Sequence, residues 1–156
     1  MPRANKLAVV FIALLFGYYE IYRWVPLGAW NGEFYWPVMN DQFYPDIVIG
    51  VLLLWMLSAF WRQRAVGMWI AVSLLMLWIG VHLFDWWIPY LHGTGAEREG
   101  FYQFYSFRTQ ILPVIGNHHP PDAGHAVLDF FVLLALILSS SAAIVSSHDG
   151  NRVRRS

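Results

Sequence analysis

Four long apolar segments constrain this chain more than any other feature of its sequence. A helix that crosses about 30 Å of hydrocarbon needs roughly 20 mainly apolar residues, and the segments that approach this length are residues 7–25, 46–61, 66–87 and 123–145. Hydrophobic residues make up 58% of the 156 residues and charged residues only 13%, which is too apolar for a soluble domain. The sequence therefore predicts an all-α integral membrane protein, a single domain folded as a four-transmembrane-helix bundle with the lipid bilayer as its partner.

The first two segments have unusual ends, and both are interpreted as spans. Arg3 and Lys6 precede the first apolar run as in a signal peptide, but no small-residue cleavage site follows it. The second segment is short, and Pro45 is expected in the first turn of its helix, where a missing N–H group costs nothing.

Lysine and arginine are placed unevenly in the segments that flank the spans. They occur in both tails and in the short loop after the second span, at Arg3, Lys6, Arg62, Arg64, Arg152, Arg154 and Arg155. Residues 26–45 contain neither, and in residues 91–122 Arg98 and Arg108 accompany two glutamates. Because basic residues favour the cytoplasmic side, we expect both termini in the cytoplasm of a cell-membrane protein, with 26–45 and 91–122 as its outer loops.

The long outer loop contains an aromatic-rich stretch, residues 96–112, with the sequence AEREGFYQFYSFRTQIL. The spacing of its aromatic and charged residues predicts an interfacial helix lying on the outer surface. The alternative is an aromatic-rich loop packed on the bundle.

Ionisable residues are concentrated in the outer halves of the predicted spans. His82 and Asp85 occur in the third span, and His125 and Asp129 in the fourth. An ionisable side chain near the bilayer centre costs about 2.5 to 3.5 kcal/mol, so such residues persist where they pair or bind something. Helical spacing places each pair on one face of its helix, and we expect these four residues to form an outer-leaflet polar site.

Five further polar residues are secondary candidates, each with a simpler explanation. Asp122 follows two prolines and precedes a helix, so it is expected to act as an N-cap. Glu20 and Arg23 are spaced to neutralise each other or to reach the interface. His118 and His119 lie in a proline-containing loop, where they are expected to be solvated.

The chemistry of the four-residue site is left open among three options. Imidazole and carboxylate ligands without thiolate suit Zn, Fe or Mn, and the chain contains no cysteine. His82 and His125 could instead be axial ligands of a haem, a weaker option because the aspartates would add negative charge beside the macrocycle. Without a cofactor, the same groups could bind a small lipophilic ligand or act on it as acid and base, so the sequence does not decide whether the protein is an enzyme.

A structural role is the alternative to a ligand site. The chain is tryptophan-rich, with nine tryptophans, and could be an accessory subunit that packs against other membrane-protein subunits. Its polar layer would then be an interhelical hydrogen-bond network. A formal net charge of zero provides no field for nucleic acid, and H-E-x-x-H, Walker-type and G-x-S-x-G motifs are absent.

Overall fold

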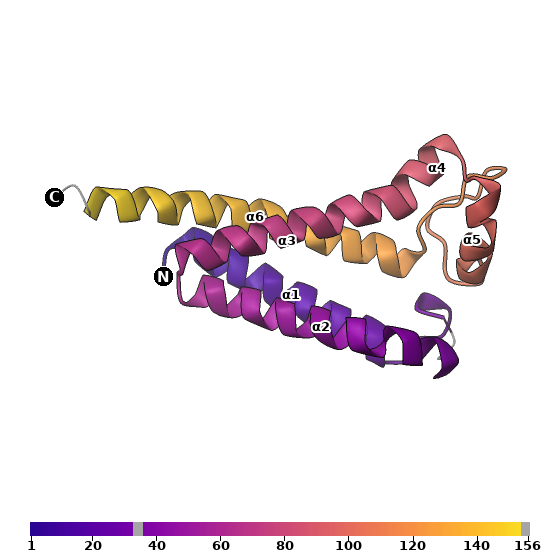
Figure 1. The fold of residues 1–156 in the computed structure, drawn as a ribbon, viewed down its shortest axis with the longest axis horizontal. Coiled ribbons are helices and arrows are strands. Elements are labelled where there is room, and N and C mark those ends of the chain that lie inside the picture. The colour runs from indigo at the N-terminus through magenta and orange to yellow at the C-terminus, as the bar shows by residue number, and fades with distance from the viewer. Residues whose placement is uncertain (33–35, 154–156) are drawn as a thin grey trace.

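The structure is a computed structural model that describes the backbone of residues 1–32 and 36–153, and the side chains of these residues except 36–42, 104 and 149–153. Long helices dominate it (Figure 1). They are α1 (Arg3–Trp24), α2 (Trp36–Trp61), α3 (Ala65–His82), which continues through η2 (Leu83–Trp87) into α4 (Ile88–His92), and α6 (Ala123–Val153). The shorter elements are η1 (Gly28–Trp30), η3 (Ala96–Arg98) and α5 (Glu99–Tyr105).

Four helices in the described part of the chain are long and apolar enough to cross a membrane, as the sequence predicts. They are Arg3–Trp24, Phe43–Trp61, Ala65–His92 and Ala123–His148. The helices nevertheless extend beyond the predicted segments, because an apolar run marks what lipid can accommodate and not where backbone hydrogen bonding stops. The largest difference is in α2, which begins at Trp36, so that Pro45 lies inside the helix and not in its first turn.

The helices pack around α1 and α6. α6 contacts α1 and α3, and α1 also contacts α2. Ile12, Leu15, Leu53, Leu75 and Val132 are fully or almost fully buried between them. Large apolar side chains such as Val66 and Leu77 remain exposed on the outside of the bundle, which is the arrangement expected where lipid contacts the surface.

The two ends of the bundle differ. Both termini lie at one end, and α4 and α5 lie at the other (Figure 1). We call the second end the outer end, after the orientation that the sequence predicts, and residues 93–122 the outer segment. The outer segment is tied to its neighbours by backbone hydrogen bonds, in which the Thr109 amide donates to the Ala29 carbonyl at 2.7 Å and the Ala123 amide donates to the Thr109 carbonyl at 2.7 Å.

The predicted helix over residues 96–112 is shorter in the structure. Only Ala96–Arg98 and Glu99–Tyr105 are helical there, and turns and irregular backbone follow. The aromatic rings of Phe101, Tyr102 and Tyr105 lie 5.0–5.7 Å from the ring of Trp86, measured between centroids. The segment is therefore held by aromatic packing on the bundle, because three rings gain more by covering Trp86 than by continuing a polar helix.

Candidate functional site

A π-helical turn interrupts the third long helix at the depth of the polar residues. In η2, the Ile88 amide donates its hydrogen bond to the Leu83 carbonyl, five residues earlier. Such turns are rare in proteins, and those that occur are often found at functional sites. Here the wider turn allows His82 and Trp87, which are five residues apart, to reach the same carboxylate, that of Asp129 on α6.

His82 and Asp129 form a closed pair in which each polar atom has a partner. The His82 Nδ1–H group donates to Asp129 Oδ1, and Trp87 Nε1 donates to Asp129 Oδ2 at 2.7 Å. Trp78 Nε1, one turn before His82, donates to His82 Nε2 at 3.0 Å. Since Nε2 accepts this bond, the proton of the neutral imidazole lies on Nδ1. Asp129 is only 6% exposed, so the pair joins α3 to α6 inside the bundle.

Asp85 lies apart from this pair. Its Oδ1 accepts a hydrogen bond from Arg98 Nη2 of the outer segment at 2.6 Å, and its side chain is 35% exposed. The sequence places Asp85 on the same face as His82, but that spacing assumes a regular α-helix. The π turn changes the direction of every side chain within it, which is why Asp85 points to the outer segment.

A second imidazole–carboxylate pair is built at the start of α6. Asp122 is its N-cap, as predicted, because its Oδ1 accepts from the backbone N–H of His125 at 2.9 Å. Asp122 Oδ2 accepts from His125 Nδ1 at 2.9 Å and from Arg108 Nη1 at 3.3 Å. The carboxylate is fully buried.

Two side chains that the sequence did not single out complete this pair. Arg108 Nη1 donates to the Tyr22 hydroxyl at 2.9 Å, and that hydroxyl lies 3.2 Å from His125 Nδ1. Gly124 makes room for Tyr22, because a Cβ atom there would overlap the tyrosine ring. The sequence signal for Arg108 is weak, because a single arginine in a loop gives no indication that its side chain contacts Tyr22 and Asp122.

Asp122 carries a negative charge throughout the physiological pH range. Burial by itself raises the pKa of its carboxyl, but the hydrogen bonds from His125, together with the Arg108 guanidinium, outweigh burial and hold the pKa below its ordinary value. A charged acceptor keeps the His125 proton on Nδ1.

The two pairs meet through their imidazoles, whose ring centroids are 6.0 Å apart. The His125 ring also lies against Trp86, at 4.7 Å between centroids, and against Tyr105 at 5.5 Å. It is 14% exposed. Its Nδ1 is occupied by Asp122, whereas its Nε2 has no hydrogen-bond partner among the described residues. His125 Nε2 is therefore the one ring nitrogen of the two pairs without a hydrogen-bond partner among the described residues.

The arrangement gives no support to a metal or haem site. Among the described residues, no group of three or more His, Cys, Asp and Glu side chains is placed to hold a metal ion. Both His82 nitrogens are used, and Asp85 is paired with Arg98. An axial bond from His82 Nε2 to a haem iron would first require the loss of the Trp78 hydrogen bond.

Glu20 and Arg23 do not neutralise each other. Arg23 donates from Nε at 2.9 Å and from Nη2 at 2.6 Å to Asp46 Oδ2, and the Tyr19 hydroxyl donates to Asp46 Oδ1 at 2.8 Å. This ion pair links α1 to α2. Two short hydrogen bonds to a nearly buried carboxylate are stronger than a pair between residues three apart on an exposed helix face.

The two loop histidines are packed, contrary to the expectation that they are solvated. His118 Nδ1 donates to the Tyr90 carbonyl at 2.8 Å. The His119 ring stacks on Tyr102, with centroids 5.4 Å apart, and its Nε2 lies 3.5 Å from Glu99 Oε1. Both help to hold the outer segment and lie outside the two imidazole–carboxylate pairs.

Comparison of the chain with known protein families, with curated proteins and with solved structures finds no match. Its function is therefore inferred from the residues themselves.

Proposed function

We propose that this chain is a four-span cell-membrane protein that binds a small lipophilic molecule at its outer end, with His125 as the hydrogen-bonding group. The observation that carries the proposal is the open Nε2 atom of an imidazole that is otherwise fixed by Asp122. An oriented imidazole with one free nitrogen is the arrangement that proteins use to bind, and sometimes to deprotonate, a hydroxyl group.

The protonation of His125 defines the chemistry of the ligand. Because Nδ1–H donates to Asp122, Nε2 carries the lone pair of the neutral ring and accepts a hydrogen bond. The ligand group that meets it is therefore an O–H or N–H donor. Trp86 and Tyr105 flank the ring and suit an apolar or aromatic body. We assign no catalytic step to the site.

The His82–Asp129 pair has a different role in this proposal. Its polar atoms are already satisfied by Trp78 and Trp87, so it has little capacity left for a ligand. It serves as an interhelical lock between α3 and α6. A polar pair whose atoms all have partners needs no ligand. It is therefore also compatible with the second candidate function, an accessory subunit of a larger membrane complex in which the polar layer is structural.

The ligand proposal is tested with 4-hexylphenol and its methyl ether, 4-hexylanisole, added to the purified protein in a neutral detergent. The phenol is expected to raise the melting temperature of the protein, and the ether, which has no donor, to raise it much less. His125→Phe keeps a ring between Trp86 and Tyr105 but removes the acceptor, and should weaken phenol binding by about tenfold, the equivalent of one hydrogen bond.

His119→Phe is the matched control, because it changes a histidine of the same outer end that lies outside the pair with Asp122. Equal stabilisation by phenol and ether, or equal binding by the two histidine variants, would contradict the proposal. If neither compound binds and mild detergent extracts the chain only within a larger complex, the subunit function is supported instead.

The proposed orientation can be tested by labelling, because the chain contains no cysteine. Val114→Cys introduces a thiol at an exposed position of the outer segment, and Arg62→Cys introduces one in the loop between α2 and α3. A membrane-impermeant maleimide is expected to label the first variant on intact cells and the second only after permeabilisation. The reverse pattern would place the termini outside.

A further inference from the structure

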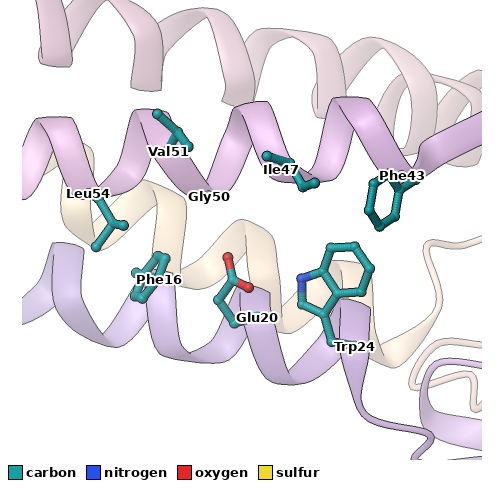
Figure 2. A pocket seen from close by; sticks show the side chains of 8 residues that line it. All are labelled: Phe16, Glu20, Trp24, Phe43, Ile47, Gly50, Val51 and Leu54. Atoms are coloured by element: carbon teal, nitrogen blue, oxygen red, sulfur yellow. The ribbon is translucent and has the colours of Figure 1, made fainter.

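A groove between α1 and α2 faces away from α6, with one acidic side chain inside it (Figure 2). Its volume is about 450 Å³, which is within the range of small-molecule sites. The lining residues come from one stripe of each helix and, apart from Glu20 and Gly50, are large and apolar: Phe16, Trp24, Phe43, Ile47, Val51 and Leu54. Several of them are exposed, so the groove is open along its side.

Glu20 differs from the other acidic residues of the candidate spans. Asp46 pairs with Arg23, Asp85 with Arg98, and Asp129 with His82. Glu20 makes no ion pair or hydrogen bond with any side chain that the structure describes. A carboxylate at this depth is costly unless something pairs with it.

The groove is shaped around this carboxylate. A Cβ atom at Gly50 of α2 would lie 2.6 Å from Glu20 Oε1, so the absence of a side chain at Gly50 is what allows the carboxylate to lie against α2. Figure 2 shows the Glu20 carboxylate between Phe16 and Trp24, directed toward α2. The closest cation in sequence, Arg23, already donates two hydrogen bonds to Asp46.

The charge around the groove and the depth of Glu20 along α1 together indicate what kind of molecule could occupy the groove. Glu20, Arg23 and Asp46 leave one net negative charge at the outer ends of α1 and α2. Glu20 lies one helical turn, about 6 Å, inside Trp24, where a cation needs its own apolar body to reach it. The Trp24 ring, in edge contact with Phe43 at 5.7 Å, provides an aromatic neighbour for that cation.

We propose that the α1–α2 groove binds a lipophilic amine, with its ammonium group on Glu20 and its alkyl body along Phe16, Val51 and Leu54. A phospholipid with an amine headgroup fits less well, because its phosphate would lie beside the Glu20 and Asp46 carboxylates. The site is separate from His125 and does not depend on the function proposed for it.

The test compares dodecylamine with dodecanol, which has the same chain but no charge, by the melting temperature of the protein in a neutral maltoside detergent. Dodecylamine is expected to stabilise the native protein well beyond dodecanol. Glu20→Gln has nearly the same shape and removes no described hydrogen bond, so it should fold normally and bind dodecylamine about tenfold or more weakly. Glu97→Gln makes the same chemical change on the exposed outer segment and should bind as the native protein does.

Gly50→Ala is the second variant, because it retains the charge and displaces the carboxylate. It should weaken dodecylamine binding and leave the response to dodecanol unchanged. Equal responses to amine and alcohol, or unchanged binding in Glu20→Gln, would overturn the proposal. A dimer that dissociates in Glu20→Gln would also overturn it, since the occupant would then be a helix of a second copy.

Discussion

Asp129→Asn is expected to lower the free energy of unfolding by about 2–3 kcal/mol, although the two side chains have nearly the same shape. The carboxylate accepts from His82 Nδ1–H and from Trp87 Nε1–H. Asparagine has one acceptor oxygen, so it can accept from only one of them. Moving the His82 proton to Nε2 does not help, because that nitrogen faces the Trp78 N–H. Whichever way the amide is turned and whichever His82 nitrogen carries the proton, two hydrogen-bond donors face each other with no acceptor between them.

The measurement is reversible unfolding in mixed micelles, with Asp85→Asn as the matched control. Asp85 is partly exposed in its pair with Arg98, so its replacement should cost less than about 1 kcal/mol. Trp78→Phe should be less costly in the Asp129→Asn background than in the native protein, because removing the Trp78 N–H frees His82 Nε2 to carry the proton. If the two substitutions lower the free energy of unfolding equally, the His82–Asp129 pair does not stabilise the contact between α3 and α6.

The sequence predicts the helices of this protein well because apolar length is a local property. Residues 123–145 can cross a bilayer whatever they pack against, and Asp122 caps the following helix through atoms within three residues of it. The spacing that places His125 and Asp129 on one side of α6 depends only on regular helical geometry, which α6 has.

The sequence fails where the geometry is irregular or the partner is distant. No proline or glycine lies within the π turn at Leu83–Trp87, and Pro89 beyond it does not specify which residues form the turn, so the direction of Asp85 could not be predicted. Arg23 pairs with Asp46 of another helix and not with a neighbour in sequence. Nothing in the sequence indicates that Trp78 and Trp87 have a polar role, but their N–H groups complete the buried pair.

Asp122→Ala is expected to be among the most destabilising single changes in the chain, at about 3–5 kcal/mol. It removes the N-cap of α6, the acceptor of the His125 Nδ1–H group and one partner of Arg108. Asp122→Asn should cost less, about 2–3 kcal/mol, because asparagine is also a good N-cap and retains one acceptor oxygen, while its NH2 group replaces an oxygen that accepts from buried donors. The difference between the two variants, measured by unfolding at neutral pH, reports what the cap and the buried acceptor contribute.

The charge of Asp122 can be separated from its shape by acidification. Because the pKa of Asp122 is lower in the folded protein than in the unfolded chain, the unfolded chain takes up more protons as the pH falls below about 4. The stability contributed by the charge is therefore complete above that pH and is lost below it. The native protein should be more stable than Asp122→Asn at neutral pH, and the difference should shrink on acidification. A difference that stays constant down to pH 2 would mean that the carboxylate acts through its shape and hydrogen bonds alone.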